Sequence, residues 1–109
     1  MSVMNLERMQ QIQRELQDKY GANWIQMAPE NGHYSVLWAV SEIGEMIDII
    51  KKEGWQAIMD DPQVREDFVK EWVDVQMFMT DVTLCFRMTP EEITKAYEEK
   101  HAYNMKRWD

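Results

Sequence analysis

The chain has 109 residues, a length that suits one domain and is too short for two of ordinary size. Twenty Asp and Glu against twelve Lys and Arg give a net charge of −8, which argues against a nucleic-acid partner, because binding to a phosphate backbone depends on clustered basic side chains. Charged residues interrupt every apolar run well before the roughly 18 residues that a membrane helix needs. The single cysteine, Cys85, has no partner in the chain, and the first ten residues lack the basic-then-apolar order of a secretory signal. We therefore expect one domain over residues 1–109, located in the cytoplasm, with neither a nucleic acid nor a membrane as its partner.

Hydrophobic periodicity predicts four main helices and no strand, because no segment alternates between apolar and polar residues as a strand does. The predicted helices cover about residues 5–20, 35–53, 62–87 and 90–107, with a loop over 21–34 and a short segment of weaker helical character around 55–59. Gly21 and Gly54 follow the first two helices, as is typical of helix ends. Asp61-Pro62 and Thr89-Pro90 are start signals for the last two. The expected fold class is all-α, a four-helix bundle.

Two pairs of acidic residues fall on the apolar sides of the second and third predicted helices. Glu42 and Glu45 form one pair and Glu71 and Asp74 the other, each with the i, i+3 spacing that brings like charges close together. Glu71 projects from the broad apolar face of its helix, where an isolated carboxylate is costly unless a partner or a cation compensates. Oxygen ligands alone favour Mg²⁺, with Mn²⁺ as a substitute. The alternative is that these acids are solvated or pair with lysines from elsewhere in the fold.

The last predicted helix carries a complementary set of polar and basic side chains. Lys100, Asn104 and Arg107 are spaced four and three residues apart, so they share one helix face. Arg offers a bidentate fork and Lys a point charge to phosphate oxygens. Together with an acidic metal site, this face indicates a metal-bound polyphosphate as ligand. An ordinary solvated tail is the alternative interpretation.

The residues that carry these features resemble the all-α NTP pyrophosphatases, a group that includes MazG-like proteins and the dimeric dUTPases. The matching segments read SEIGEMID at 41–48, with its E-x-x-E, and KEWVDVQMFMTD at 70–81, with its E-x-x-D. YEEKHAYNMKRWD at 97–109 is similar to the C-terminal K-x-x-x-N-x-x-R motif of the dimeric dUTPases. The resemblance extends over about residues 35–109.

This resemblance implies an enzyme that hydrolyses a (deoxy)nucleoside triphosphate, dUTP among the options, to the monophosphate and pyrophosphate. The implied Mg²⁺ ligands are Glu42, Glu45, Glu71 and Asp74, and the implied phosphate-binding residues are Lys100, Asn104 and Arg107. By the same analogy Glu45 positions or deprotonates the attacking water, while Lys100 and Arg107 stabilise charge on the leaving pyrophosphate. The dUTPase branch binds uracil with a Gln and an Asn of its first helix and a Trp after the first acidic helix. Here Gln17, near Gln13, and Trp55 are the counterparts, but the Asn is missing.

A second apolar strip on the third helix, away from its main apolar face, is more than one small bundle can bury. It consists of Val69, Val73, Met77 and Leu84. We therefore expect a homodimer or homotetramer that packs through its helices. The competing hypothesis is a non-enzymatic helical oligomerisation or adaptor module, whose acidic pairs contact a partner's basic residues. Such a module would need neither a divalent metal nor a nucleotide.

Overall fold

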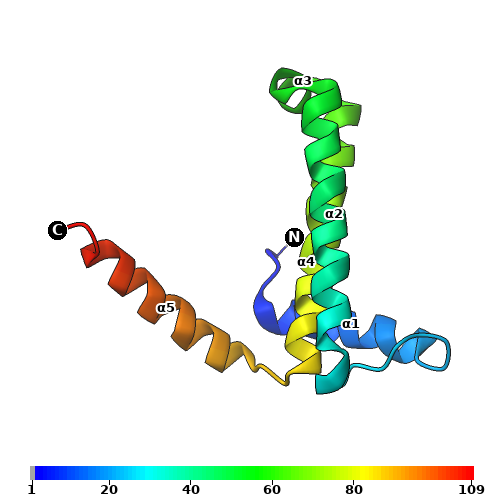
Figure 1. Cartoon of the computed structure of the whole chain (residues 1–109), viewed down its shortest axis with the longest axis vertical. Coiled ribbons are helices and arrows are strands. Elements are labelled where there is room, and N and C mark those ends of the chain that lie inside the picture. Colours follow the sequence, from blue (N-terminus) through cyan, green and yellow to red (C-terminus); the bar gives the residue numbers. More distant parts are fainter. Residues whose placement is uncertain (1) are drawn as a thin grey trace.

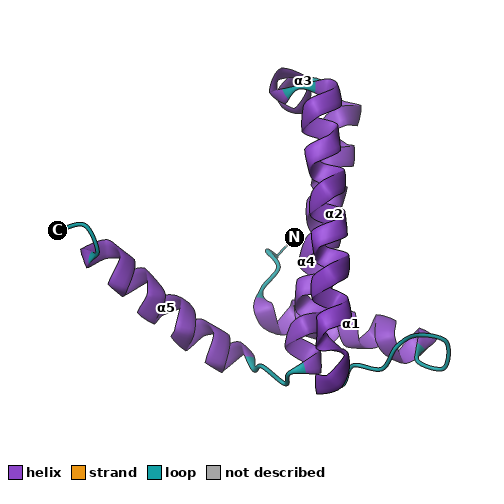
Figure 2. Ribbon diagram, viewed as in Figure 1, coloured by secondary structure: helices purple, strands orange, loops and turns teal. Residues whose placement is uncertain are grey.

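The computed structural model describes residues 2–109, which are helical with connecting loops and contain no strand (Figure 2). The elements in chain order are α1 Leu6–Tyr20, the 3₁₀ turn η1 Pro29–Asn31, α2 Gly32–Glu53, α3 Trp55–Asp60, α4 Pro62–Cys85 and α5 Pro90–Lys106. The all-α prediction is confirmed. Within the described residues no helix combines the length and the apolar character that a membrane crossing requires.

Polar side chains cap the starts of three helices, and two of these caps, Asp61 and Thr89, lie at the start signals that the sequence predicts. Asn5 and Asp61 accept hydrogen bonds from backbone N–H groups in the first turns of α1 and α4. The Thr89 hydroxyl accepts one from the Glu92 N–H at 3.1 Å and begins α5. Each cap satisfies a donor that would otherwise have no partner inside the helix.

Helix α2 begins earlier than its sequence predicts, at Gly32 instead of near residue 35. The Asn31-Gly32 pair is typical of a turn, but Gly32 has helical backbone angles, and η1 leads directly into α2. A Cβ atom on Gly32 would overlap the ring of Phe86, which follows α4. Gly32 is therefore required for close packing, a reason that the local sequence does not reveal.

Helix α4 ends at Cys85, two residues before the predicted end, in a Schellman-type turn. The Met88 N–H donates to the Thr83 carbonyl at 2.9 Å, and Arg87 has a φ of 57°. Glycine is the usual residue at this left-handed position, so the arginine conceals the helix end in the sequence. Gly54, with a φ of 86°, ends α2. The short segment that follows it, predicted to have weaker helical character, forms the helix α3.

The long helices α2 and α4 form an antiparallel pair, and α3 joins them at one end (Figure 1). At the opposite end α1 packs across α4, and η1 contacts both α2 and α4. This pairing brings the middle of α2 beside the middle of α4, where the acidic residues of both helices lie.

Helix α5 leaves the end of α4 and extends away from the other helices (Figure 1). None of its residues is buried. The chain accordingly has a radius of gyration of 16.5 Å, against about 13 Å for a compact domain of this length. The four-helix bundle expected from the sequence is therefore not completed within one chain.

The side chain of Gln10 on α1 forms hydrogen bonds to the turn between α4 and α5. Its side-chain Nε2 donates to the Thr83 hydroxyl at 3.0 Å and to the Met88 carbonyl at 2.8 Å. These two residues also form the turn that ends α4. One side chain of α1 thus contacts both sides of the bend that sets the direction of α5.

Candidate functional site

Three glutamates from two helices meet at the centre of the α2–α4 pair. Glu42 and Glu45 come from successive turns of α2, and Glu71 comes from α4. Their carboxylate oxygens all lie within 4.8 Å of one another. Two oxygens bound to one Mg²⁺ at about 2.1 Å are at most about 4.2 Å apart, so small side-chain rotations suffice for a shared ion. Three of the four residues expected as metal ligands are thus brought together, and we refer to these three glutamates as the acidic cluster; the fourth, Asp74, is not part of the group.

The acidic cluster is electrostatically unfavourable as it stands. A hydrogen bond with Glu42, burial, and the charges of Glu42, Glu45 and Asp74 together raise the pKa of Glu71 to about 7. The Oε2 atom of Glu71 is buried without a hydrogen-bond partner. Burial and the charge of Glu42 also raise the pKa of Asp74, which lies one turn further along α4. A divalent cation would relieve the repulsion and satisfy the buried oxygen, so the donor set fits such an ion.

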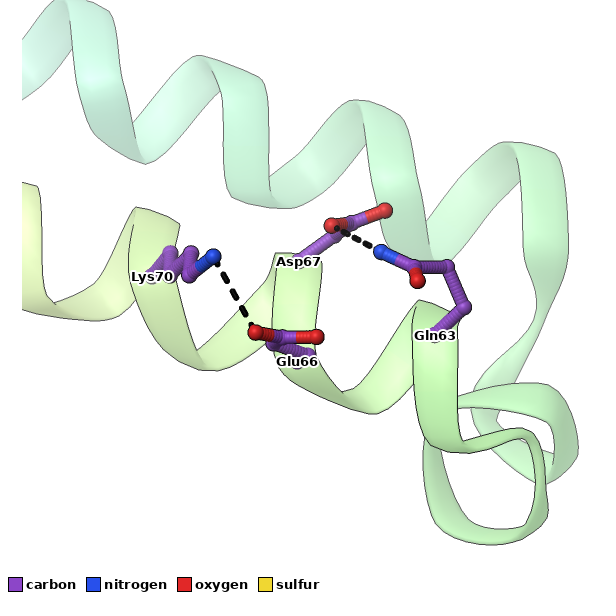
Figure 3. A network of polar contacts seen from close by, with 4 residues as sticks. All are labelled: Gln63, Glu66, Asp67 and Lys70. Atoms are coloured by element: carbon purple, nitrogen blue, oxygen red, sulfur yellow. Dashed lines mark hydrogen bonds and ion pairs between the residues drawn. The ribbon is translucent and has the colours of Figure 1, made fainter.

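The basic side chain nearest in sequence, Lys70, is engaged elsewhere. Its Nζ lies 3.1 Å from a carboxylate oxygen of Glu66, while Gln63 donates to Asp67 at 2.9 Å (Figure 3). The Lys70–Glu66 pair is exposed, with 70% of the Lys70 side chain accessible. Among residues 2–109 neither ion pair includes a member of the acidic cluster. The structure therefore contains no ion pair in which a lysine neutralises these acids among residues 2–109.

A pocket of about 620 Å³ lies next to the acidic cluster, with Asp74 on its wall. Helices α1, α2 and α4 and the loop after α1 contribute its lining. The aromatic lining residues are Trp24, Trp38 and Phe78; the polar ones are Gln13, Gln17, Asn23, Asp74 and Asp81. The rings of Trp38 and Phe78 lie 5.8 Å apart between centroids. An apolar cavity with a few convergent polar groups is the usual form of a small-molecule site.

The carboxylate of Asp81 is the most deeply buried charged group of this pocket. Its residue is 3% exposed, and the Gln17 Nε2 donates to its Oδ1 at 3.3 Å. Burial raises the pKa of Asp81 to about 6, although hydrogen bonds from Gln13 and Gln17 act in the opposite direction. Asp81 lies outside the acidic motifs that the sequence predicts as a metal site. Its position seven residues after Asp74, two turns along the same helix side, is the signal that links it to the site.

The two residues expected to bind a base have different positions. Gln17 lines the pocket, as does its neighbour Gln13. Trp55 begins α3 at the far end of the α2–α4 pair, is 69% exposed and does not line this pocket. Trp24 and Trp38 are the tryptophans that do.

Of the three residues expected to bind phosphate, two lie on α5 and the third directly follows it, and all three are exposed. They are Lys100, Asn104 and Arg107. Because α5 extends away from α2 and α4, the chain does not bring these side chains to its own acidic cluster (Figure 1). The Arg107 guanidinium instead lies over the Trp108 ring, 4.9 Å from its centroid.

Comparison with known proteins adds no assignment to this geometry: no protein-family model, no curated protein and no solved structure matches the chain.

Proposed function

We propose that the protein hydrolyses a (deoxy)nucleoside triphosphate to the monophosphate and pyrophosphate, in a reaction that requires Mg²⁺ or, as a substitute, Mn²⁺. The observation that carries the proposal is the acidic cluster, which combines three carboxylates, a buried oxygen without a partner and a neighbouring ligand-sized pocket. The resemblance of segments 41–48, 70–81 and 97–109 to all-α NTP pyrophosphatases agrees with it.

The acids of α2 and α4 would hold the metal, with Glu42, Glu45 and Glu71 as ligands and Asp74 at the pocket side. When bound, Mg²⁺ supplies neutralisation of the polyphosphate charge and a lower pKa for water. Glu45, the exposed member of the cluster, is the proposed general base. It orients a water molecule and accepts its proton as the water oxygen bonds to phosphorus. The bridging P–O bond between the α- and β-phosphoryl groups breaks, and pyrophosphate leaves.

We further propose that α5 supplies its basic face to the acidic cluster of a second copy. Two observations support this arrangement. The isolated chain exposes 8729 Å², whereas a compact monomer of this mass exposes about 6400 Å². The outward face of α2 is apolar yet accessible, with Leu37 60% and Val40 58% exposed. A homodimer or homotetramer would cover this face, and Lys100, Asn104 and Arg107 would then bind the phosphates and stabilise the leaving group.

The first experiment measures pyrophosphate release from a panel of dNTPs and NTPs, with Mg²⁺ and with EDTA. Release that depends on the metal, and that Glu71→Gln abolishes, supports the proposal. The matched control is Glu66→Gln, which removes an exposed acid of the same helix and leaves the acidic cluster intact. Absence of release from every nucleotide would refute the proposed hydrolysis and favour the adaptor module. Full activity in Glu71→Gln would instead refute the assignment of the acidic cluster as the metal site.

Mixing two inactive variants tests whether α5 acts on a second copy. Glu71→Gln retains an intact α5, and Arg107→Ala retains an intact acidic cluster. If each site combines both copies, a one-to-one mixture with free exchange recovers about a quarter of the wild-type activity, because half of the dimers hold one intact site of two. No recovery above the separate variants, with exchange verified, would show that α5 does not act in this way.

A further inference from the structure

The inner wall of the pocket carries three polar side chains that act as one hydrogen-bonding group. Gln13 and Gln17 lie one turn apart on α1, and both carboxamides bond to the Asp81 carboxylate on α4. Each carboxamide nitrogen carries two hydrogens, so one remains after the bond to Asp81. The carboxylate accepts up to about four hydrogen bonds, so it also has capacity left. The wall therefore offers an anionic acceptor flanked by two N–H donors.

The position of this group relative to the acidic cluster fits the length of a nucleoside. Asp74 and Asp81 both line the pocket and are seven residues apart on α4, which corresponds to about 10 Å along the helix. A nucleotide whose phosphates lie at the acidic cluster would direct its base toward Asp81. Trp24, Trp38 and Phe78 line the pocket and provide flat surfaces for a planar ring.

We propose that Asp81, with Gln13 and Gln17, determines base specificity by selecting a pyrimidine whose ring N–H lies between two carbonyl groups. This inference rests on the proposed function and adds a residue to it. The edge of a uracil or thymine ring presents acceptor, donor and acceptor, which is complementary to the donor, acceptor and donor of the wall. Cytosine presents an unprotonated ring nitrogen and an amino group at this edge. Its ring nitrogen would face the Asp81 acceptor, and its amino group would face an N–H donor, so two of the three positions are mismatched.

A purely structural role does not explain why this position is a carboxylate. If the residue only joined α1 to α4, an uncharged side chain would accept the same two amide bonds without the cost of burying a charge. The acid is 3% exposed, and no Lys, Arg or His lines the pocket around it. An acceptor that must bind an additional N–H from a ligand gains from the negative charge, because charge-assisted hydrogen bonds are stronger than neutral ones.

The test compares kcat/KM for dUTP and dCTP in the wild-type protein, Asp81→Asn and Asp67→Asn. Asp67 is the matched control, since it is an acid on α4 that bonds to Gln63 outside the pocket. We expect Asp81→Asn to lower kcat/KM for dUTP by about 10- to 100-fold and to leave that for dCTP unchanged or higher. Asp67→Asn should change neither.

A second variant keeps the inference testable if Asp81→Asn does not fold. Gln17→Met removes one flanking donor at a half-buried position and conserves the shape of the side chain. It is expected to reduce the ratio of dUTP to dCTP activity by about 10-fold. Equal losses for both nucleotides in a folded variant would overturn the assignment of Asp81 while leaving the proposed hydrolysis intact. A wild-type protein that is inactive on every nucleotide would instead refute the proposed function itself.

Discussion

The buried Asp81 gives a quantitative prediction about stability. Its pKa is about 6 in the folded chain against the ordinary value of 3.8 for an aspartate. The folded state therefore holds a proton between about pH 4 and pH 6 that the unfolded chain releases, so protonation stabilises the fold in acid and this stabilisation is lost as the pH rises through 6. At 1.36 kcal/mol for each unit, the charged form costs about 3 kcal/mol above that window.

Replacing Asp81 with Asn removes this pH-dependent cost, because the amide carries no charge to desolvate. We expect Asp81→Asn to raise the free energy of unfolding by up to about 3 kcal/mol at pH 8, relative to its effect at pH 4. Hydrogen bonds from Gln13 and Gln17 to a neutral amide are weaker than those to a carboxylate. The pKa of about 6 already includes the contribution of these bonds to the charged form of Asp81. Titration of the acidic cluster affects both proteins equally, so it cancels when the free energy of unfolding of the wild type is subtracted from that of Asp81→Asn.

Urea denaturation at a series of pH values, followed by far-ultraviolet circular dichroism, measures this difference. All samples are compared at one protomer concentration, because association would otherwise contribute to the apparent stability. The free energy of unfolding of Asp81→Asn minus that of the wild type should rise between about pH 4 and pH 6 and then level off. A difference that stays constant over this range would show that Asp81 is not a buried carboxylate with a raised pKa, and would refute the reasoning.

Three further predictions concern the acidic cluster, a close helix contact and the exposed face of α2. Since the pKa of Glu71 is about 7, binding of Mg²⁺ should release about one proton near pH 6 and almost none near pH 8.5. Calorimetry in buffers of different ionisation enthalpy measures this release, and equal release at both pH values would contradict the prediction. Gly32→Ala should destabilise the fold by about 1–3 kcal/mol through overlap with the Phe86 ring, whereas Gly44→Ala, whose Cβ meets nothing within 4 Å, should stabilise it by up to about 1 kcal/mol; thermal unfolding of both variants checks the contrast. Val40→Glu should shift the protein toward the monomer in analytical ultracentrifugation, and an unchanged sedimentation coefficient would mean that this face is not an interface.

The sequence predicts much of the fold because its signals are local. Asp61-Pro62 and Thr89-Pro90 begin helices where expected, since capping depends on residues within one turn. The end of α4 differs from the predicted one because Arg87 occupies a left-handed position that usually belongs to glycine. The start of α2 differs from the predicted one because Gly32 packs against Phe86, which is distant in sequence.

The distinction between local signals and contacts distant in sequence also explains which parts of the candidate site can be predicted. Glu42, Glu45 and Glu71 could be grouped from the sequence, because helical spacing and one antiparallel pairing suffice to bring them together. The pocket could not be foreseen, because it depends on how α1 and the loop carrying Trp24 pack against α4. The direction of α5 is likewise set by backbone angles at one corner and not by the periodicity of the helix itself.

The bend that Gln10 spans makes α5 a lever arm. A helix of 17 residues is about 25 Å long, so a rotation of about 10° at the Thr83–Met88 turn displaces its far end by about 4 Å. The side chain that holds this turn belongs to α1, the helix that also carries Gln13 and Gln17 into the pocket. A small tilt of α1 that rotated this turn would therefore be magnified at Lys100 and Arg107.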